Sequence, residues 1–142
     1  MKYGIELTNT IDVVYSNYCR PYCKEWNIPQ TAFDILMFLA NNPKYTTARD
    51  VVEVRRIKPN LVSINIDKLV NLGYLERKTV EGDRRKVHLV LTKKADAIIK
   101  KGRKIQDAFV DELLEGIDPE TIKVVQKAFK EMKMNLERMN LK

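Results

Sequence analysis

Three adjacent basic side chains follow a tight turn in the middle of the chain: Arg84, Arg85 and Lys86. The turn covers residues 81–83, and the segments on either side of it, 74–80 and 86–92, have the composition of β-strands. In the second segment apolar residues occupy every other position, which is typical of a strand with one buried face. The spacing therefore predicts a β-hairpin with a cationic tip. A guanidinium on such a narrow finger suits the electronegative minor groove of DNA, and a hairpin with a merely solvated turn fits the same residues.

Two short helical patterns precede the hairpin and favour the first interpretation. Thr47 and Asp50 have the spacing of a helix N-cap and its acidic partner, and this first pattern ends near residues 55–57. A second helix is predicted to begin at Pro59, because proline is favoured in a first helical turn, and to end before Gly73, which suits a left-handed C-cap. Its apolar positions form a broad stripe: Leu61, Val62, Ile64, Ile66, Leu69 and Val70. Helix, turn, helix and basic hairpin in this order predict a winged helix-turn-helix, whose second helix enters the major groove.

The sequence here resembles the multiple-antibiotic-resistance-regulator (MarR) family of bacterial transcription regulators. The residues that carry the resemblance lie at the end of the second helix and along the hairpin: Leu69, Gly73, Tyr74, Leu75, Glu76, Arg77, Asp83, Arg84, Arg85, Leu89, Leu91 and Thr92. The order of the predicted elements extends the resemblance over nearly the whole chain. Two positions depart from the family: Ala95 stands where Gly is usual, and Arg56 stands where Gly is frequent in the turn between the two helices. Because a left-handed backbone is costly for Arg, we expect either a different turn or a register shifted by one residue.

The charge distribution agrees with a protein that contacts nucleic acid. The chain has 142 residues, 44% of them hydrophobic, and a net charge of +7, which fits one domain with a real core. Residues 49–94 hold 12 Lys or Arg and 6 Asp or Glu, so they carry six of the seven net positive charges. Basic charge in this segment would release counterions from DNA phosphates. No apolar run approaches the ~20 residues of a membrane span, and the N-terminus does not resemble a signal peptide, so we expect a cytoplasmic protein without membrane contact.

Apolar stripes at both ends of the chain predict further helices. One runs towards Trp26, one covers about residues 30–40, and a long one opens at Thr92. A last one begins at Asp118-Pro119, where Asp118 is a cap and Pro119 is a first-turn proline. In the last helix apolar residues recur at alternating steps of three and four, the spacing that packs a helix against a partner: Ile122, Val125, Phe129, Met132, Leu136 and Met139. With Ile11, Val14 and Tyr18 of the first helix, we expect this seam to form a homodimer interface, as the resemblance also implies, although an intramolecular core uses the same spacing.

The predicted fold class is therefore mainly α with a small antiparallel β-hairpin. We expect residues 1–142 to form a single chain of this type, with a winged helix-turn-helix region at 30–92. Residues 1–28 and 93–142 would supply the dimerisation helices.

The candidate DNA contacts fall into two groups: side chains that contact base edges and residues that contact backbone phosphates. Side chains early in the second helix are expected to reach base edges: Lys58, Asn60, Leu61 and Ser63. Leu61 would meet a thymine methyl group or else belong to the core. The resemblance implies that Arg85 enters the minor groove, and an ion pair with Asp83 would orient it. The expected phosphate contacts are Arg56, Arg77, Arg84 and Lys86, and Thr47 either offers its backbone N–H to a phosphate or only caps its helix.

These features predict a homodimeric repressor that binds an inverted-repeat operator and is released by a small-molecule effector. A weak candidate pocket for that effector is formed by aromatic residues that fit a core equally well: Tyr15, Tyr18, Tyr22 and Trp26. One alternative is a redox-sensing regulator through Cys19 and Cys23, whose thiols the nearby Arg20 and Lys24 would activate. The other alternative is a winged-helix adaptor that binds protein.

Catalytic and metal-binding functions find no support in the residue pattern. His88 is the only histidine, and we expect it to be solvated or at an interface. No nucleophile–base pair or phosphate-binding loop is recognisable. We therefore expect no enzymatic activity, no metal and no cofactor.

Overall fold

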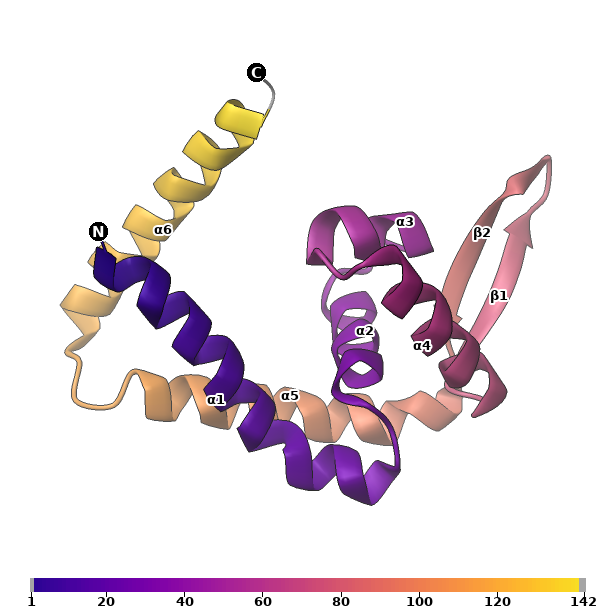
Figure 1. Ribbon diagram of the computed structural model, residues 1–142, viewed down its shortest axis with the longest axis horizontal. Coiled ribbons are helices and arrows are strands. Elements are labelled where there is room, and N and C mark those ends of the chain that lie inside the picture. Colours follow the sequence, from indigo (N-terminus) through magenta and orange to yellow (C-terminus); the bar gives the residue numbers. More distant parts are fainter. Residues whose placement is uncertain (1, 141–142) are drawn as a thin grey trace. The chain divides into compact units, whose positions relative to one another are not determined.

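The computed structural model describes residues 2–140, without the side chains of Lys2 and Arg84. Its elements are α1 (Lys2–Trp26), α2 (Gln30–Asn41), α3 (Ala48–Asp50), the π-helical turn η1 (Val51–Arg55), α4 (Pro59–Asn71), β1 (Leu75–Val80), β2 (Asp83–Leu91), the 3₁₀ turn η2 (Lys93–Ala95), α5 (Asp96–Leu113) and α6 (Pro119–Asn140) (Figure 1). They form two compact units, one ending at Gln106 and the other beginning at Asp107 within α5. The predicted fold class, mainly α with a small antiparallel hairpin, is confirmed for the described residues.

Helix α2 forms the centre of the first unit. Seven of its twelve residues are buried, as expected of a helix that is apolar on most sides. The surrounding elements contribute further buried side chains to this core: Cys19, Cys23, Val62, Ile66, Leu69, Leu75, Leu89, Ile98 and Ile105. Helix α5 approaches α2 closely at Gly102, where a Cβ atom would lie 2.5 Å from Met37 Sδ. A larger residue at Gly102 would therefore displace core side chains.

The first helix of the helix-turn-helix begins with the predicted cap. The Thr47 hydroxyl accepts the Asp50 N–H at 3.1 Å, and the Asp50 carboxylate accepts the Thr47 N–H at 3.0 Å. Burial alone would raise the pKa of Asp50, but the hydrogen bonds from Thr47 and Thr46 outweigh it and hold this pKa below its ordinary value. Beyond Asp50 the chain continues as η1 rather than as the expected α-helix.

Arg56 occupies the turn between η1 and α4 and adopts the conformation that the sequence argued against. Its φ is 65° and its ψ is 38°, in the left-handed region. The expectation of a different turn or a shifted register is therefore wrong. Burial of Val51 before the turn and packing of Ile57 after it offset the strain of about 1–2 kcal/mol that a left-handed L-residue carries.

The second helix and the hairpin follow the sequence closely. Pro59 stands at the first position of α4. Gly73, with a φ of 84°, ends it, and the N–H groups of Gly73 and Tyr74 donate to the carbonyl oxygens of Val70 and Leu69. Strands β1 and β2 pair from Leu75↔Leu91 to Thr79↔Val87, with an irregularity before the tip. Figure 1 shows the hairpin extending beyond α4.

The second unit contains the end of α5 and α6. Asp118 caps α6 as predicted, because its carboxylate accepts the Thr121 N–H at 3.0 Å and the Thr121 hydroxyl at 2.6 Å. No described residue of α6 is buried, and on the predicted seam Phe129 and Leu136 are each 61% exposed. The apolar seam of α6 is therefore uncovered in the described chain. Among the described residues, no helix is both long enough and apolar enough to cross a membrane.

Replacing Arg56 by Gly should stabilise the fold, because glycine adopts the left-handed region without steric strain. The greater freedom of glycine in the unfolded chain reduces this gain, so we expect the free energy of unfolding to rise by up to about 1 kcal/mol. Urea denaturation measures it. Arg56→Lys is the control and should leave stability unchanged, because it keeps the strain and the charge. A loss of stability in Arg56→Gly alone would contradict a strained left-handed turn.

Candidate nucleic-acid interface

Helix α4 has one buried face and one exposed face. Val62, Asn65, Ile66 and Leu69 are buried, and the Asn65 amide donates to the Leu61 carbonyl oxygen at 2.8 Å. The four residues expected to reach base edges are exposed: Lys58, Asn60, Leu61 and Ser63. Leu61 is 40% exposed, so it lies outside the core.

Ile64 is the residue of this face that sequence reasoning missed. It was counted with the apolar stripe of α4, yet its side chain is 62% exposed. Helical spacing was the available signal, since Ile64 is four residues from Asn60 and lies opposite the buried stripe. The exposure of Ile64 was missed because an isoleucine in a helix usually belongs to the buried core.

The hairpin is attached to the helix-turn-helix through Thr46. The Leu89 N–H donates to the Thr46 carbonyl oxygen at 2.7 Å, and the Thr46 hydroxyl lies 2.6 Å from Nδ1 of His88. The Thr46 N–H donates in turn to the Asp50 carboxylate at 3.0 Å. His88 is therefore half-buried at the base of the hairpin and bonded within the chain, rather than freely solvated.

The hairpin tip differs from the expectation in one contact. Asp83 accepts the backbone N–H of Arg85 at 3.0 Å, and no ion pair joins its carboxylate to the Arg85 guanidinium in the described structure. The expected pair is thus replaced by a local turn, because an Asp carboxylate readily bonds the backbone two residues further along. Arg85 and Lys86 are exposed, and the side chain of Arg84 lies outside the description.

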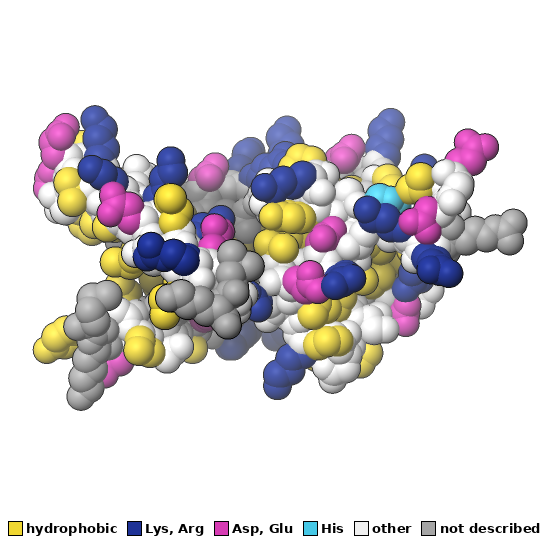
Figure 2. All heavy atoms as spheres, turned by 90° about the horizontal axis from the view of Figure 1, so that it is seen from above, with side chains coloured by type: hydrophobic (Ala, Val, Ile, Leu, Met, Phe, Trp, Pro, Cys, Tyr) yellow, Lys and Arg dark blue, Asp and Glu magenta, His cyan; other side chains and the backbone are white. Residues whose placement is uncertain are grey.

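A hollow of about 440 Å³ separates the hairpin from the start of α3. It is lined by Thr47, Ala48, Arg49, Asp83, Arg85, Lys86 and Val87. Arg49 was not among the predicted contacts, although it follows the cap residue by only two positions. Figure 2 shows Lys and Arg side chains interspersed with acidic and hydrophobic ones over one face of the molecule.

The other expected phosphate contacts differ in their availability. Arg56 is exposed at the turn. Arg77 of β1 forms an ion pair with Asp67 of α4. This pair ties the hairpin to α4 through Nη2 of Arg77 and leaves the other N–H groups of that guanidinium for a phosphate. Arg49 is paired in the same way, because its Nε lies 2.8 Å from Glu53 Oε1.

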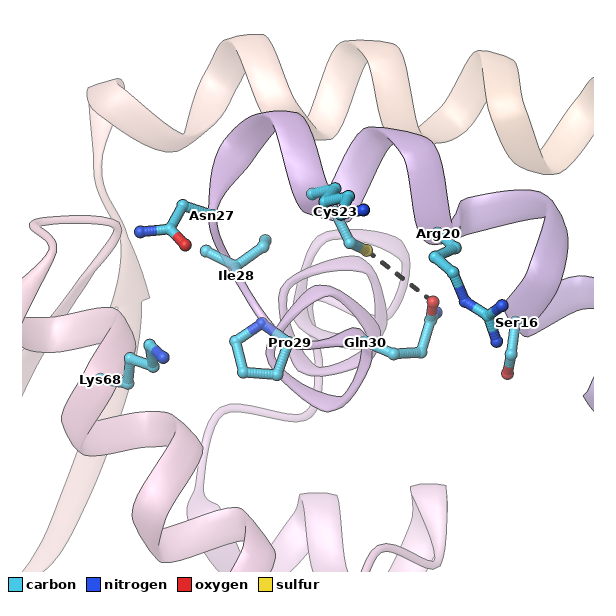
Figure 3. A pocket seen from close by; sticks show the side chains of 9 residues that line it. Ser16, Arg20, Cys23, Asn27, Ile28, Pro29, Gln30 and Lys68 are labelled. Atoms are coloured by element: carbon cyan, nitrogen blue, oxygen red, sulfur yellow. Dashed lines mark hydrogen bonds between the residues drawn. The ribbon is translucent and has the colours of Figure 1, made fainter.

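A second hollow, of about 470 Å³, lies where α1 meets α2 (Figure 3). Its lining includes three cationic side chains, and it is formed by Ser16, Arg20, Cys23, Lys24, Asn27, Ile28, Pro29, Gln30 and Lys68. None of the four aromatic residues expected to form an effector pocket lines it.

Those four aromatic residues pack against the core instead: Tyr15, Tyr18, Tyr22 and Trp26. The Trp26 ring stacks on Phe33 with centroids 5.7 Å apart. Burial raises the pKa of Tyr15, against a hydrogen bond from Gln106 that lowers it. These four side chains therefore contribute to the packing of α1 on the core.

A chain of side-chain contacts leads from this second hollow to the helix-turn-helix. The Cys23 thiol lies 3.8 Å from Gln30 Oε1, and Gln30 Nε2 donates to Asp34 Oδ1 at 2.9 Å. Asp34 Oδ2 in turn lies 3.6 Å from Nη2 of Arg55, the last residue of η1. Burial raises the pKa of the Asp34 carboxyl, while Gln30 and Arg55 oppose that shift.

The two cysteines are unfavourably placed for redox sensing. Both are buried free thiols that form no disulfide in the described chain. Burial raises the pKa of Cys19 and raises that of Cys23 to about 11. The expected lowering of the thiol pKa values by Arg20 and Lys24 is contradicted, because burial is the largest cause of both upward pKa shifts and neither cation is among their causes. In the described chain, no three His, Cys, Asp or Glu side chains are grouped as a metal site.

The expected dimerisation residues of α1 are only partly covered. Ile11 and Tyr18 are half-buried, and Val14 is 47% exposed. Each end of the chain therefore offers apolar surface.

Helix, left-handed turn, exposed helix and anchored basic hairpin define a winged helix-turn-helix protein. Residues 26–86 match the MarR family. The structure is similar to that of transcriptional regulator PA3341, with a TM-score of 0.83 and 26% identity over 96% of this chain and 98% of that one. A MarR transcriptional regulator from Methanosarcina mazei Go1 gives a TM-score of 0.83 at 19% identity, over 98% and 99% of the two chains.

A third solved structure is that of a putative MarR family transcriptional regulator from Listeria monocytogenes complexed with 26mer DNA. Its TM-score is 0.83 at 18% identity, over 93% of this chain and 87% of that one. The family match covers the residues from the end of α1 to the first part of β2. The whole chain has the fold of MarR-family transcriptional regulators.

Proposed function

We propose that the protein is a transcription regulator that binds double-stranded DNA as a homodimer and represses by occupying an inverted-repeat operator. The observation that carries this proposal is that one compact region, the head, presents both the exposed face of α4 and a basic hairpin. The head consists of the helix-turn-helix and the hairpin, which Thr46 joins by hydrogen bonds. The similar Listeria monocytogenes protein was solved in complex with 26mer DNA, which supports the proposal. As a regulator that binds DNA, the protein would be located in the cytoplasm.

Each basic element of the head has a distinct role in this proposal. Helix α4 lies in the major groove, where Lys58 and Asn60 reach base edges. Arg85 enters the minor groove, whose width varies with sequence. Arg49, Arg56 and Lys86 bind phosphates, which positions the head without reading sequence.

Dimerisation through the terminal helices explains the apolar surface left at both ends of the chain. The α6 seam and the exposed apolar residues of α1 would each be covered by a partner subunit. Two heads related by a two-fold axis would bind half-sites about one helical turn, roughly 10 bp, apart.

Release by a small molecule fits the hollow between α1 and α2 better than the aromatic cluster on α1. Arg20, Lys24 and Lys68 at its rim favour an anionic ligand. A ligand that engages Gln30 competes with Asp34, and Asp34 contacts Arg55 directly before the turn into α4. Allosteric coupling of this kind is typically worth ~1–3 kcal/mol. Oxidation of Cys19 or Cys23 is the less favoured trigger, because both thiols are buried and have raised pKa values.

Salt dependence separates DNA binding from the alternative of a protein-binding adaptor. If the head contacts six to ten phosphates, affinity for DNA from upstream of its own gene should fall roughly 10³–10⁵-fold between about 50 and 200 mM salt. Gel shift or fluorescence anisotropy measures this. Lys86→Ala should lower the slope by about one unit, whereas Lys133→Ala in α6 should not change it. Absence of binding at low salt, or a flat salt dependence, would favour the adaptor.

Dimerisation is tested by placing a charge on the α6 seam. Phe129→Glu should give monomers, because a dimer would bury an unpaired carboxylate. Met134→Glu is a matched control, since Met134 has the same exposed fraction of 61% but lies off the seam. Sedimentation velocity measures the mass, and circular dichroism checks helix content. A wild-type monomer at micromolar concentration, or a Phe129→Glu dimer, would refute this interface.

A further inference from the structure

Two neighbouring apolar side chains project from the exposed face of α4. Leu61 is 40% exposed and Ile64 is 62% exposed, and residues three apart lie next to each other on a helix surface. The core does not need them, since Val62, Ile66 and Leu69 already form the buried face of this helix. The pair is therefore an apolar patch on the part of the head that α4 would present to DNA.

Charge identifies the occupant of this patch. Arg56 and Lys58 are exposed directly before this helix, and residues 49–94 carry six of the seven net positive charges of the chain. A second copy of this head would bring the same positive charge to the contact, whereas a polyanion is attracted to it. DNA is therefore the occupant that these charges favour.

The major groove offers a helix a defined set of groups, and the apolar one among them is the C5-methyl group of thymine. We propose that Leu61 and Ile64 together read thymine methyl groups, so that α4 selects A·T pairs in each half-site. Ile64 suits this role because its β-branched side chain is stiff at χ1 and holds its methyl groups in a fixed direction. Asn60 lies four residues before Ile64 on the same face, and its amide would pair with an adjacent adenine. The inference rests on the proposed DNA-binding function and deepens it.

Uracil substitution tests this inference without altering the protein. The preferred duplex is first selected from a random DNA library with the full-length wild-type chain. Thymines in the selected half-sites are then replaced one at a time by deoxyuridine, which removes only the methyl group. We expect affinity to fall about fourfold at each thymine that the pair contacts, on the order of the gain from burying one carbon of hydrocarbon. Thymines outside the half-sites should show no change.

Protein variants assign the effect to the two side chains. Leu61→Ala/Ile64→Ala should bind the thymine duplex more weakly than wild type does and should no longer distinguish thymine from uracil. Val54→Ala is a matched control, because Val54 is 44% exposed but lies on η1, and it should retain the thymine preference. Both substituted positions are exposed, so the unfolding midpoint should be unchanged.

The outcomes separate this inference from the proposed function. Selection of a tight, salt-sensitive duplex that wild type binds equally well with thymine or uracil would overturn methyl reading and leave DNA binding intact. Failure to select any duplex would overturn the proposed function and the inference with it. Thymine preference that persists in Leu61→Ala/Ile64→Ala would show that other residues read the methyl groups.

Discussion

Thr46 provides the contacts on which the geometry of the winged helix-turn-helix depends. Its carbonyl oxygen accepts the Leu89 N–H, its hydroxyl bonds His88, and its N–H donates to Asp50 of the capping box. Thr46 therefore fixes both the start of α3 and the base of the hairpin. Without these bonds the hairpin would be held to the head mainly by Leu75 and Leu89 and by the exposed Asp67–Arg77 ion pair. Exposed pairs of that kind contribute little to stability.

The first compact unit of the chain carries two surfaces of different chemistry. Towards α4 and the hairpin it presents exposed cations and two exposed apolar side chains, which suit a DNA groove. Between α1 and α2 it presents a hollow rimmed by cations, and Gln30 and Asp34 connect that hollow to Arg55. Because Arg55 directly precedes the left-handed turn at Arg56, these contacts are the route by which the proposed ligand would change the orientation of α4.

Local signals in the sequence predicted much of this fold and less of the site. The Thr47–Asp50 cap, Pro59 at the start of α4, Gly73 at its end and the Asp118 cap each depend on residues a few positions apart, so their patterns are readable. The left-handed Arg56 was rejected because local strain argued against it, and packing on either side of the turn overcame that strain. The position of the second hollow and the hydrogen bonding of Thr46 to β2 depend on how distant segments pack. No short-range pattern encodes them.

Hydrogen exchange at the Leu89 amide tests most directly the claim that helix-turn-helix and hairpin form one rigid head. This N–H bonds Thr46 rather than β1, so only the attachment of the hairpin protects it. The Val87 amide, two residues closer to the tip on the same edge of β2, is the internal reference. We predict that Leu89 exchanges at least about tenfold more slowly than Val87 after correction for intrinsic rates, since opening must break the bond to Thr46. Equal exchange at the two amides would contradict the account and indicate a hairpin that moves independently of α4.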